Sequence, residues 1–119
     1  MPLTQPVGSD DYVQGPSDAA LTLVEYGDYQ CSYCGQAYPI VKQIQRTYPD
    51  SLRFVFRNFP IPEIHPEALA AAEFAEYAGS QGKFWEAHDA LYENQDQLGE
   101  SFYRELATSL GLDPAAAEA

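Results

Sequence analysis

Two cysteines, Cys31 and Cys34, are the residues of this chain whose type and spacing best suit chemistry. A Cys-x-x-Cys pair can close and open an intramolecular disulfide, and the thiolate of one cysteine can exchange with a disulfide in another molecule. The sequence of 119 residues contains no further cysteine, so any thiol chemistry must use this pair. The spacing therefore predicts a redox site.

The residues around the cysteines predict a strand that turns directly into a helix. Residues 21–26 form an apolar run rich in β-branched and aromatic side chains, which favours a strand. Apolar residues then recur at helical spacing, at Ala37, Tyr38, Val41, Ile44 and Tyr48. Cys31 is therefore expected near the first turn of a helix, where unpaired N–H groups and the helix dipole favour a thiolate. Cys34 follows one turn later on the same face.

Two other interpretations of the cysteine pair stay open on spacing alone: a structural disulfide and part of a zinc site. A structural zinc site needs about four ligands, whereas the chain adds only two distant histidines, His65 and His88. Attachment of haem would require histidine at position 35, which is glycine. We expect no metal and no other cofactor. His65 is expected at a helix cap or on the surface, and His88 is expected in the core.

The charge of the chain restricts its partners. It carries 18 acidic and 6 basic residues, which gives a net charge of −12 and a pI near 4.2. Such a charge disfavours nucleic acid and anionic membrane surfaces, and it suits either a solvated acidic surface or the recruitment of basic partners. The sequence shows no signal peptide and no apolar run of transmembrane length. We therefore expect no membrane insertion and a cytoplasmic location, or the bacterial periplasm or cell envelope if a signal was removed.

The rest of the chain divides into three segments. Residues 1–18 are rich in proline, glycine, serine and aspartate and predict an arm, with at most a short edge strand near Tyr12. Residues 19–62 hold the first strand, the helix and a second strand at 52–59, which should pair in parallel through a right-handed crossover. Residues 63–119 show three helical patterns, at 67–78, 83–93 and 101–110.

Glu25 is the acidic residue of the otherwise apolar first strand. By strand alternation its side chain shares a face with Leu21 and Leu23. An exposed face would explain a carboxylate there, but parallel strands of α/β folds are usually covered on both faces. We therefore expect the Glu25 carboxyl to be buried, with a pKa raised by desolvation.

Three segments, taken in order, resemble the DsbA-like thiol–disulfide oxidoreductases. They are LVEYGDYQCSYCG at residues 23–35, RFVFRNFP at 53–60 and GKFWEAH at 82–88. The resemblance extends over about residues 15–113. It implies an α/β fold in which a thioredoxin-like βαβ core is followed by a helical insertion domain, with the division between the two near residue 63.

The resemblance also implies roles for single residues. Cys31 would be the exposed attacking thiol and Cys34 the buried resolving thiol, while Glu25 would relay the proton of Cys34. Apart from the resemblance, the positions of Tyr29 and Tyr33 beside the cysteines suggest that these rings either contact a bound peptide or cover Cys34. The implied function is disulfide exchange with cysteine-containing protein substrates, together with a redox partner that recycles the disulfide.

Two competing functions remain. Cys-Ser-Tyr-Cys also resembles glutaredoxin motifs, which would indicate deglutathionylation, although the helices after the second strand argue against it. The alternative from another class is a redox-switched adaptor, whose disulfide changes its conformation without turnover. The dipeptide Ser32-Tyr33 lacks the histidine of the most oxidising relatives, so one source of thiolate stabilisation is absent.

The chain ends where DsbA-like proteins continue into a cis-proline loop, a β-hairpin and a last helix. We therefore expect the C-terminal strands of the sheet to be missing and the second strand, residues 53–59, to leave an edge unpaired. An unpaired edge invites a partner strand, which predicts a homo-oligomer, most simply a two-fold dimer that pairs strands or exchanges helices. The alternative is that the chain is a piece of a longer protein.

Overall fold

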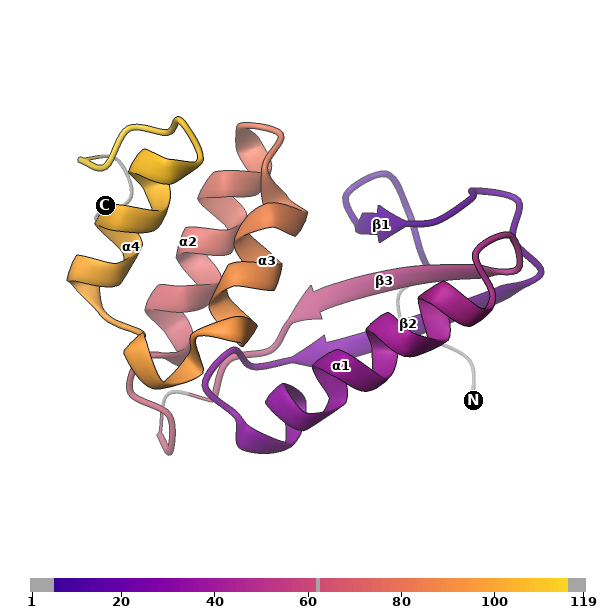
Figure 1. The fold of residues 1–119 in the computed structure, drawn as a ribbon, viewed down its shortest axis with the longest axis horizontal. Helices are drawn as coiled ribbons and strands as arrows, with labels where there is room; N and C mark the ends of the chain where they lie inside the picture. Colours follow the sequence, from indigo (N-terminus) through magenta and orange to yellow (C-terminus); the bar gives the residue numbers. More distant parts are fainter. Residues whose placement is uncertain (1–5, 62, 116–119) are drawn as a thin grey trace.

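The computed structural model describes residues 6–61 and 63–115 of the chain. A three-stranded sheet has α1 lying along it, and the other helices stand together at one end (Figure 1). The elements are β1 Tyr12–Gln14, β2 Leu21–Gly27, α1 Ser32–Thr47, β3 Leu52–Asn58, α2 Ala68–Ser80, α3 Phe84–Glu93, the 3₁₀ turn η1 Gln95–Gln97 and α4 Glu100–Ser109. This architecture confirms the predicted α/β class, with a βαβ unit followed by helices.

Strand β3 lies at the centre of the sheet. β1 pairs with it in antiparallel orientation and β2 in parallel orientation, so the expected parallel pairing of the two strands that α1 connects is confirmed. The register places Leu23 beside Phe54 and Glu25 beside Phe56. The prediction that the second strand leaves the open edge is wrong, because β1 pairs with one side of it. Among the described residues, β2 is the long strand with a single neighbour.

The apolar core lies between one face of the sheet and the helices. Phe54 and Phe56 alternate along β3 and point to this face, where both are buried. α2 faces α3 with a row of buried alanines, whose small side chains let the two helices pack closely. Full burial of a large apolar side chain stabilises a fold by about 1.5–3 kcal/mol, so this face holds the helical end to the sheet.

The boundaries of the helices follow local signals in the sequence. Gly82 has a φ of +78°, a left-handed conformation that suits glycine, in the turn between α2 and α3. η1 was not predicted, because a turn of three residues carries no helical periodicity. No helix in the described part of the chain combines the length and the apolar character that crossing a bilayer would require.

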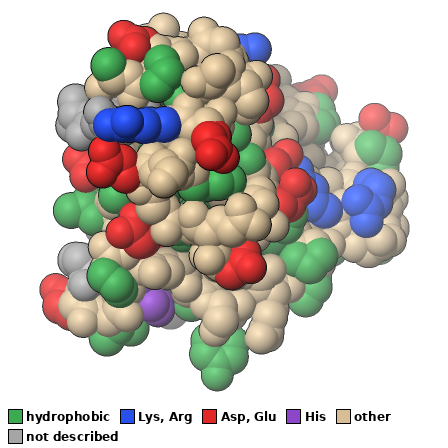
Figure 2. Space-filling model, turned by 60° about the vertical axis from the view of Figure 1, so that its left-hand side comes forward, with side chains coloured by type: hydrophobic (Ala, Val, Ile, Leu, Met, Phe, Trp, Pro, Cys, Tyr) green, Lys and Arg blue, Asp and Glu red, His purple; other side chains and the backbone are tan. Residues whose placement is uncertain are grey.

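Acidic side chains are spread over the surface of the helical end. Figure 2 turns this end forward and shows red side chains scattered among uncharged ones, with few blue side chains between them. The distribution agrees with the net charge of −12. Ion pairs tie some of these acids to neighbouring elements, as in the contact of 3.0 Å between Lys42 of α1 and Asp89 of α3.

Candidate active site

Cys31 is the N-cap residue of α1 and follows directly on the loop that leaves β2. Its backbone is extended, with φ −73° and ψ 124°, and its N–H donates to the Asp28 carbonyl at 3.0 Å. Its own carbonyl accepts the N–H of Gly35 at 3.0 Å, as the first backbone bond of the helix. The Cys31 thiol is partly exposed and free. It therefore lies at the end of the helix that attracts negative charge.

Cys34 lies in the first turn of α1 and is half-buried, with a free thiol. Burial is the main cause that raises the pKa of Cys34, and the backbone N–H of Asp28 opposes it by donating to the sulfur. Cys31 and the charge of Glu25 raise the same pKa further. The two thiols are therefore close to each other but unequal, because burial holds Cys34 in its protonated form.

Glu25 lies on the core-facing side of β2, beside Phe56 of β3. Its side chain is half-buried rather than fully buried. Desolvation raises the pKa of its carboxyl, in the direction expected from the sequence. Because its charge acts on the pKa of Cys34, the carboxyl is near enough to influence that thiol. Its part in proton transfer stays a prediction.

The two tyrosines that flank the cysteines differ completely in exposure. Tyr33 is 79% exposed and stands between the cysteines on the helix start, so a contact with substrate stays a prediction for it. Tyr29 is 0% exposed, and its hydroxyl lies 2.9 Å from Nδ1 of His88. The substrate contact predicted for Tyr29 does not fit this structure, because its ring packs against Phe56 and Tyr92 inside the core.

His88 occupies the core, as expected. Burial, with a smaller effect of the Lys42 charge, lowers its pKa to about 3, so the ring is neutral at physiological pH. Burial also raises the pKa of Tyr29, whose hydroxyl therefore stays protonated. The neutral ring can accept a hydrogen bond from the Tyr29 hydroxyl at Nδ1, so this buried hydroxyl has a partner.

Asp28, which sequence reasoning missed, connects the cysteine loop to the segment between β3 and α2. It is 3% exposed. Its Oδ1 accepts a hydrogen bond from the N–H of Gln30 at 2.8 Å. Its Oδ2 accepts one from the N–H of Ile61 at 3.0 Å and lies 2.7 Å from Nδ1 of His65. A carboxylate placed directly after an apolar strand, at the start of a loop, was the available signal.

Gln95 of η1 was missed as well. Its Nε2 donates to the carbonyls of Tyr29 and Cys31, at 2.8 Å in each case. Its Oε1 lies over Gly35, where a Cβ would collide with it. The helical end of the molecule therefore holds the start of α1 by one amide side chain. No sequence pattern marks such a glutamine, because its partners lie more than sixty positions away.

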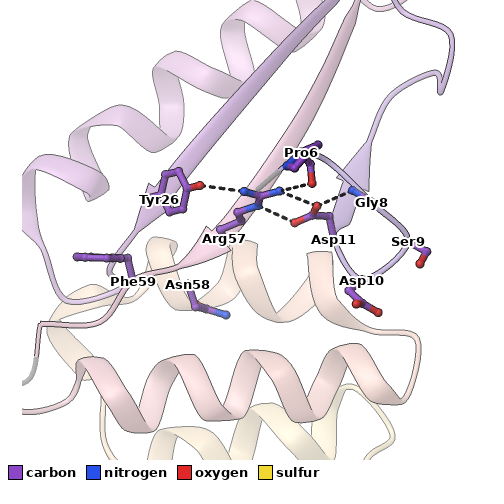
Figure 3. A pocket seen from close by; sticks show the side chains of 9 residues that line it. All are labelled: Pro6, Gly8, Ser9, Asp10, Asp11, Tyr26, Arg57, Asn58 and Phe59. Atoms are coloured by element: carbon purple, nitrogen blue, oxygen red, sulfur yellow. Dashed lines mark hydrogen bonds and ion pairs between the residues drawn. The ribbon is translucent and has the colours of Figure 1, made fainter. Parts of the chain in front are cut away.

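A separate pocket of about 530 Å³ lies on the other face of the sheet (Figure 3). It is lined by Pro6, Gly8, Ser9, Asp10, Asp11, Tyr26, Arg57, Asn58 and Phe59. The Arg57 guanidinium binds both carboxylate oxygens of Asp11, at 2.8 and 2.9 Å, and donates to the Tyr26 hydroxyl at 2.8 Å. This pocket contains none of the predicted site residues, and its ion pair ties the N-terminal segment to β3.

Curated relatives of the chain are membrane transport proteins. It is 46% identical over 112 residues to the Na⁺/H⁺ antiporter NhaA 3 of Salinispora tropica, and 39% identical over 114 residues to NhaA of Herminiimonas arsenicoxydans. These matches cover 93% and 95% of this chain but only 17% and 18% of the antiporters. They overturn the expected cytoplasmic location, which treated the chain as a separate protein, because the relatives carry the matching segment within a membrane antiporter.

Solved structures share the fold. A thioredoxin-like oxidoreductase from Silicibacter pomeroyi matches with a TM-score of 0.81 and 30% identity, over 93% of this chain and 62% of that one. Oxidised BdbD from Bacillus subtilis matches with a TM-score of 0.77 and 27% identity, over 88% and 62%. α-DsbA1 from Wolbachia pipientis, at 18% identity, has the same fold with a TM-score of 0.80.

The family assignment rests on sequence and structure together. A family model described as thioredoxin matches residues 8–119, which is nearly the whole chain. The solved relatives superimpose on 93% and 88% of this chain, and the cysteine pair stands at the start of α1. The chain therefore belongs to the thioredoxin family, and its fold is that of the DsbA-like thiol–disulfide oxidoreductases.

Proposed function

We propose that the chain is a thiol–disulfide oxidoreductase that exchanges disulfides with cysteine-containing proteins through Cys31 and Cys34. The observation that carries the proposal is the position of two free thiols at the start of one helix, with Cys31 as its N-cap. The Silicibacter pomeroyi relative, which is 30% identical, is described as a thioredoxin-like oxidoreductase. A separate redox partner would restore the disulfide after each cycle.

The proposed reaction has two exchange steps. A substrate thiolate attacks the Cys31 sulfur of the oxidised protein, the bond between Cys31 and Cys34 breaks, and the Cys34 thiolate takes up a proton. A second substrate thiolate then attacks the substrate sulfur of the mixed disulfide, so that Cys31 leaves and the substrate gains the disulfide. In the reverse direction, Cys31 attacks a substrate disulfide and Cys34 resolves it. The reduction potentials of the two partners set the direction.

Glu25 is proposed to take up and return the proton of Cys34. Its carboxyl is half-buried, and its raised pKa brings it closer to the pH at which it can exchange protons. The charge of Glu25 acts on Cys34, which supports a role in the step at that thiol rather than in the first attack at Cys31.

Tyr33 is proposed to contact the bound substrate. It lies between the two cysteines, and its ring is 79% exposed. An exposed aromatic ring beside the attacking sulfur offers apolar surface to a peptide, and its hydroxyl can stay in water. Removal of the ring should therefore weaken substrate binding more than it slows the chemical steps.

Catalysed transfer of a disulfide tests the proposed function. The oxidised chain is mixed with an excess of a reduced peptide that has two cysteines, and a recycling oxidant is supplied. We expect many peptide disulfides to form per protein molecule, and none above the uncatalysed rate with Cys31→Ser. A glutathionylated peptide, run in parallel, tests for deglutathionylation. Peptide that stays reduced while the protein disulfide stays closed would contradict the proposal.

The antiporter relatives favour a second function, a redox-switched module without turnover. In those proteins the matching segment belongs to a Na⁺/H⁺ antiporter. Oxidation or reduction of Cys31 and Cys34 would then alter how this chain docks on a transporter. This function predicts different amide hydrogen exchange in the oxidised and reduced chains, together with no multiple turnover of the peptide. Turnover therefore separates the two functions.

A further inference from the structure

Tyr92 of α3 carries an unusual polar group near the cysteines. Its side chain is 6% exposed, and its hydroxyl makes no hydrogen bond of good geometry with any described residue, although the Cys34 side chain is near enough to raise the pKa of Tyr92. The ring is held by aromatic neighbours, with centroids 4.8 Å from Tyr29 and 5.5 Å from Tyr38. Native structures leave few buried polar groups unpaired, so each one calls for a physical reason.

The hydroxyl lies between the end of β2 and the first turn of α1. A Cβ placed on Gly27 would come within 2.8 Å of it, so it packs against the backbone two residues after Glu25. Burial is the largest cause that raises the pKa of Tyr92, and the charges of Glu25 and Cys34 come next. Cys34 packs against the same core cluster that contains Tyr92. Hydroxyl, carboxyl and thiol therefore converge in one buried region.

The properties of the Tyr92 hydroxyl fit a donor rather than a base. Its pKa lies far above the ordinary value for tyrosine, so it keeps its proton at any physiological pH. In the reduced protein the neighbouring thiol is neutral and attracts a donor weakly. A thiolate on Cys34 would be a much stronger acceptor, because hydrogen bonds to an ionised group are about twice as strong as neutral ones.

We propose that the Tyr92 hydroxyl donates a hydrogen bond to the Cys34 thiolate during exchange, an inference that rests on the function proposed above. In the mixed disulfide, Cys34 gives its proton to the Glu25 carboxylate and its thiolate attacks the Cys31 sulfur. The Cys31–Cys34 bond forms, the bond from Cys31 to substrate breaks, and the substrate thiolate takes up the proton. Tyr92 keeps its own proton and stabilises the charge on the Cys34 sulfur, beside the N–H of Asp28.

Tyr92→Phe tests this role because it removes one oxygen and keeps the ring. Since that oxygen makes no hydrogen bond of good geometry in the reduced protein and its neighbour is a neutral thiol, the variant should unfold at the same denaturant concentration as the wild type or at a higher one. In a Cys31→Ser background, Cys34 alkylation is followed over a pH series. We expect its midpoint to rise by about one pH unit with Tyr92→Phe, the size that loss of one charged hydrogen bond gives.

Tyr103→Phe is the matched control. The Tyr103 hydroxyl is also buried, but it donates to Oε1 of Glu67 at 2.9 Å, between α4 and the start of α2. Its removal should lower the stability of the fold and leave the Cys34 midpoint unchanged. The two variants are therefore expected to show opposite results in the two measurements.

Disulfide transfer separates failure of this inference from failure of the proposed function. Tyr92→Phe should lengthen the lifetime of the mixed disulfide about tenfold and leave its formation at Cys31 unchanged. If the wild type transfers no disulfide, the proposed function fails, and the alkylation midpoint still decides the role of Tyr92. An unchanged midpoint in a folded Tyr92→Phe variant overturns the inference. A less stable variant also overturns it, since the hydroxyl would then already be paired.

Discussion

Single residues give the two cysteines different surroundings although they are three positions apart. Cys31 caps α1, where its N–H and its carbonyl are both engaged in the helix start. Cys34 is half-buried one turn later, and burial raises its pKa. A thiol that stays protonated attacks slowly until a base removes its proton. This difference supports the order of events proposed above, in which Cys31 attacks and Cys34 resolves.

Glu25→Gln should change both the chemistry and the pH dependence of stability. Because the folded-state pKa of Glu25 is raised, the folded protein binds more protons than the unfolded chain between pH 4.5 and the folded pKa. Its contribution to stability therefore declines as pH rises through that window, and the variant should lose this decline in denaturant titrations. The mixed disulfide should persist at least about tenfold longer. Unchanged lifetime and slope would make Glu25 an ordinary strand residue.

His88 should make the fold weaker in acid. Its folded-state pKa is lowered from 6.5 to about 3, so its contribution to stability is complete above pH 6.5 and is lost as pH falls toward 3. The loss between pH 8 and pH 5 should be about 2 kcal/mol. His88→Asn keeps an acceptor for Tyr29 but cannot titrate, so its unfolding free energy should lack this loss. Equal pH profiles for the variant and the wild type would contradict the burial argument.

Some residues of the candidate site could be predicted from the sequence pattern around them, and others could not. Cys31, Cys34 and Glu25 could be found from spacing and strand pattern, because those signals lie within a dozen positions. Asp28 and Gln95 could not, because their importance comes from partners that the fold brings from distant segments. Tyr29 was misjudged for the same reason: its position beside the cysteines gave no sign that the chain folds it inward.

The elements around the site hold the start of α1 from two sides. The carboxylate of Asp28 joins the loop before α1 to the segment after β3. From the helical end, the amide of Gln95 donates to two carbonyls of the same loop, those of Tyr29 and Cys31. We propose that these two side chains link the βαβ segment, predicted as 19–62, to the helical segment 63–119.

Because Gln95 lies so close to Gly35, we expect Gly35→Ala to change the stability of the fold in opposite directions with and without the Gln95 side chain. Gly35→Ala places a methyl group where the Gln95 amide lies, so it should displace two hydrogen bonds and destabilise the fold by about 1 kcal/mol. In a Gln95→Ala background the same change should stabilise the fold by about 0.5–1 kcal/mol, because alanine favours the helix over glycine. A double-mutant cycle in denaturant measures both values. Additive effects would mean that the two residues do not interact.

Hydrophobic periodicity located the long elements but not their neighbours. The strand at 52–59 and the three later helices were found because their patterns extend over several residues. The predicted position of the strand at 52–59 in the sheet is wrong, because the three-residue β1 pairs with one of its two sides. A pattern states which face of a strand is buried, and it does not state which strands adjoin it.

In the described part of the chain, the sheet has two edges, the three-residue β1 and the seven-residue β2, and β2 is the longer one. Leu21 at the start of this strand is 62% exposed. The N–H of Leu21 donates to the Ser51 carbonyl, so by alternation the N–H of Thr22 points away from β3. Such an edge can pair with a second copy, which is how the expected homodimer would form.

Self-association of the chain is therefore expected to depend on β2. Light scattering at micromolar concentration should show dimers of the wild type and of Thr22→Ala. Thr22→Pro removes the outward N–H and keeps the backbone bonds to β3, while the hydrogen bond from Arg53 to the Thr22 hydroxyl is lost in both variants. Only Thr22→Pro should therefore shift the chain to monomers, with unchanged helix content. A wild-type chain that is a stable monomer would contradict pairing through this edge.

The most direct test of the whole account is a trapping experiment with a peptide disulfide. The reduced Cys34→Ser variant should attach the peptide covalently at Cys31 and hold it, because the resolving thiol is absent. The reduced Cys31→Ser variant should attach it far more slowly, because burial keeps Cys34 protonated. Mass spectrometry of unreduced digests identifies the modified cysteine. Equal attachment in the two variants, or attachment in neither, would contradict the assignment of Cys31 as the attacking thiol.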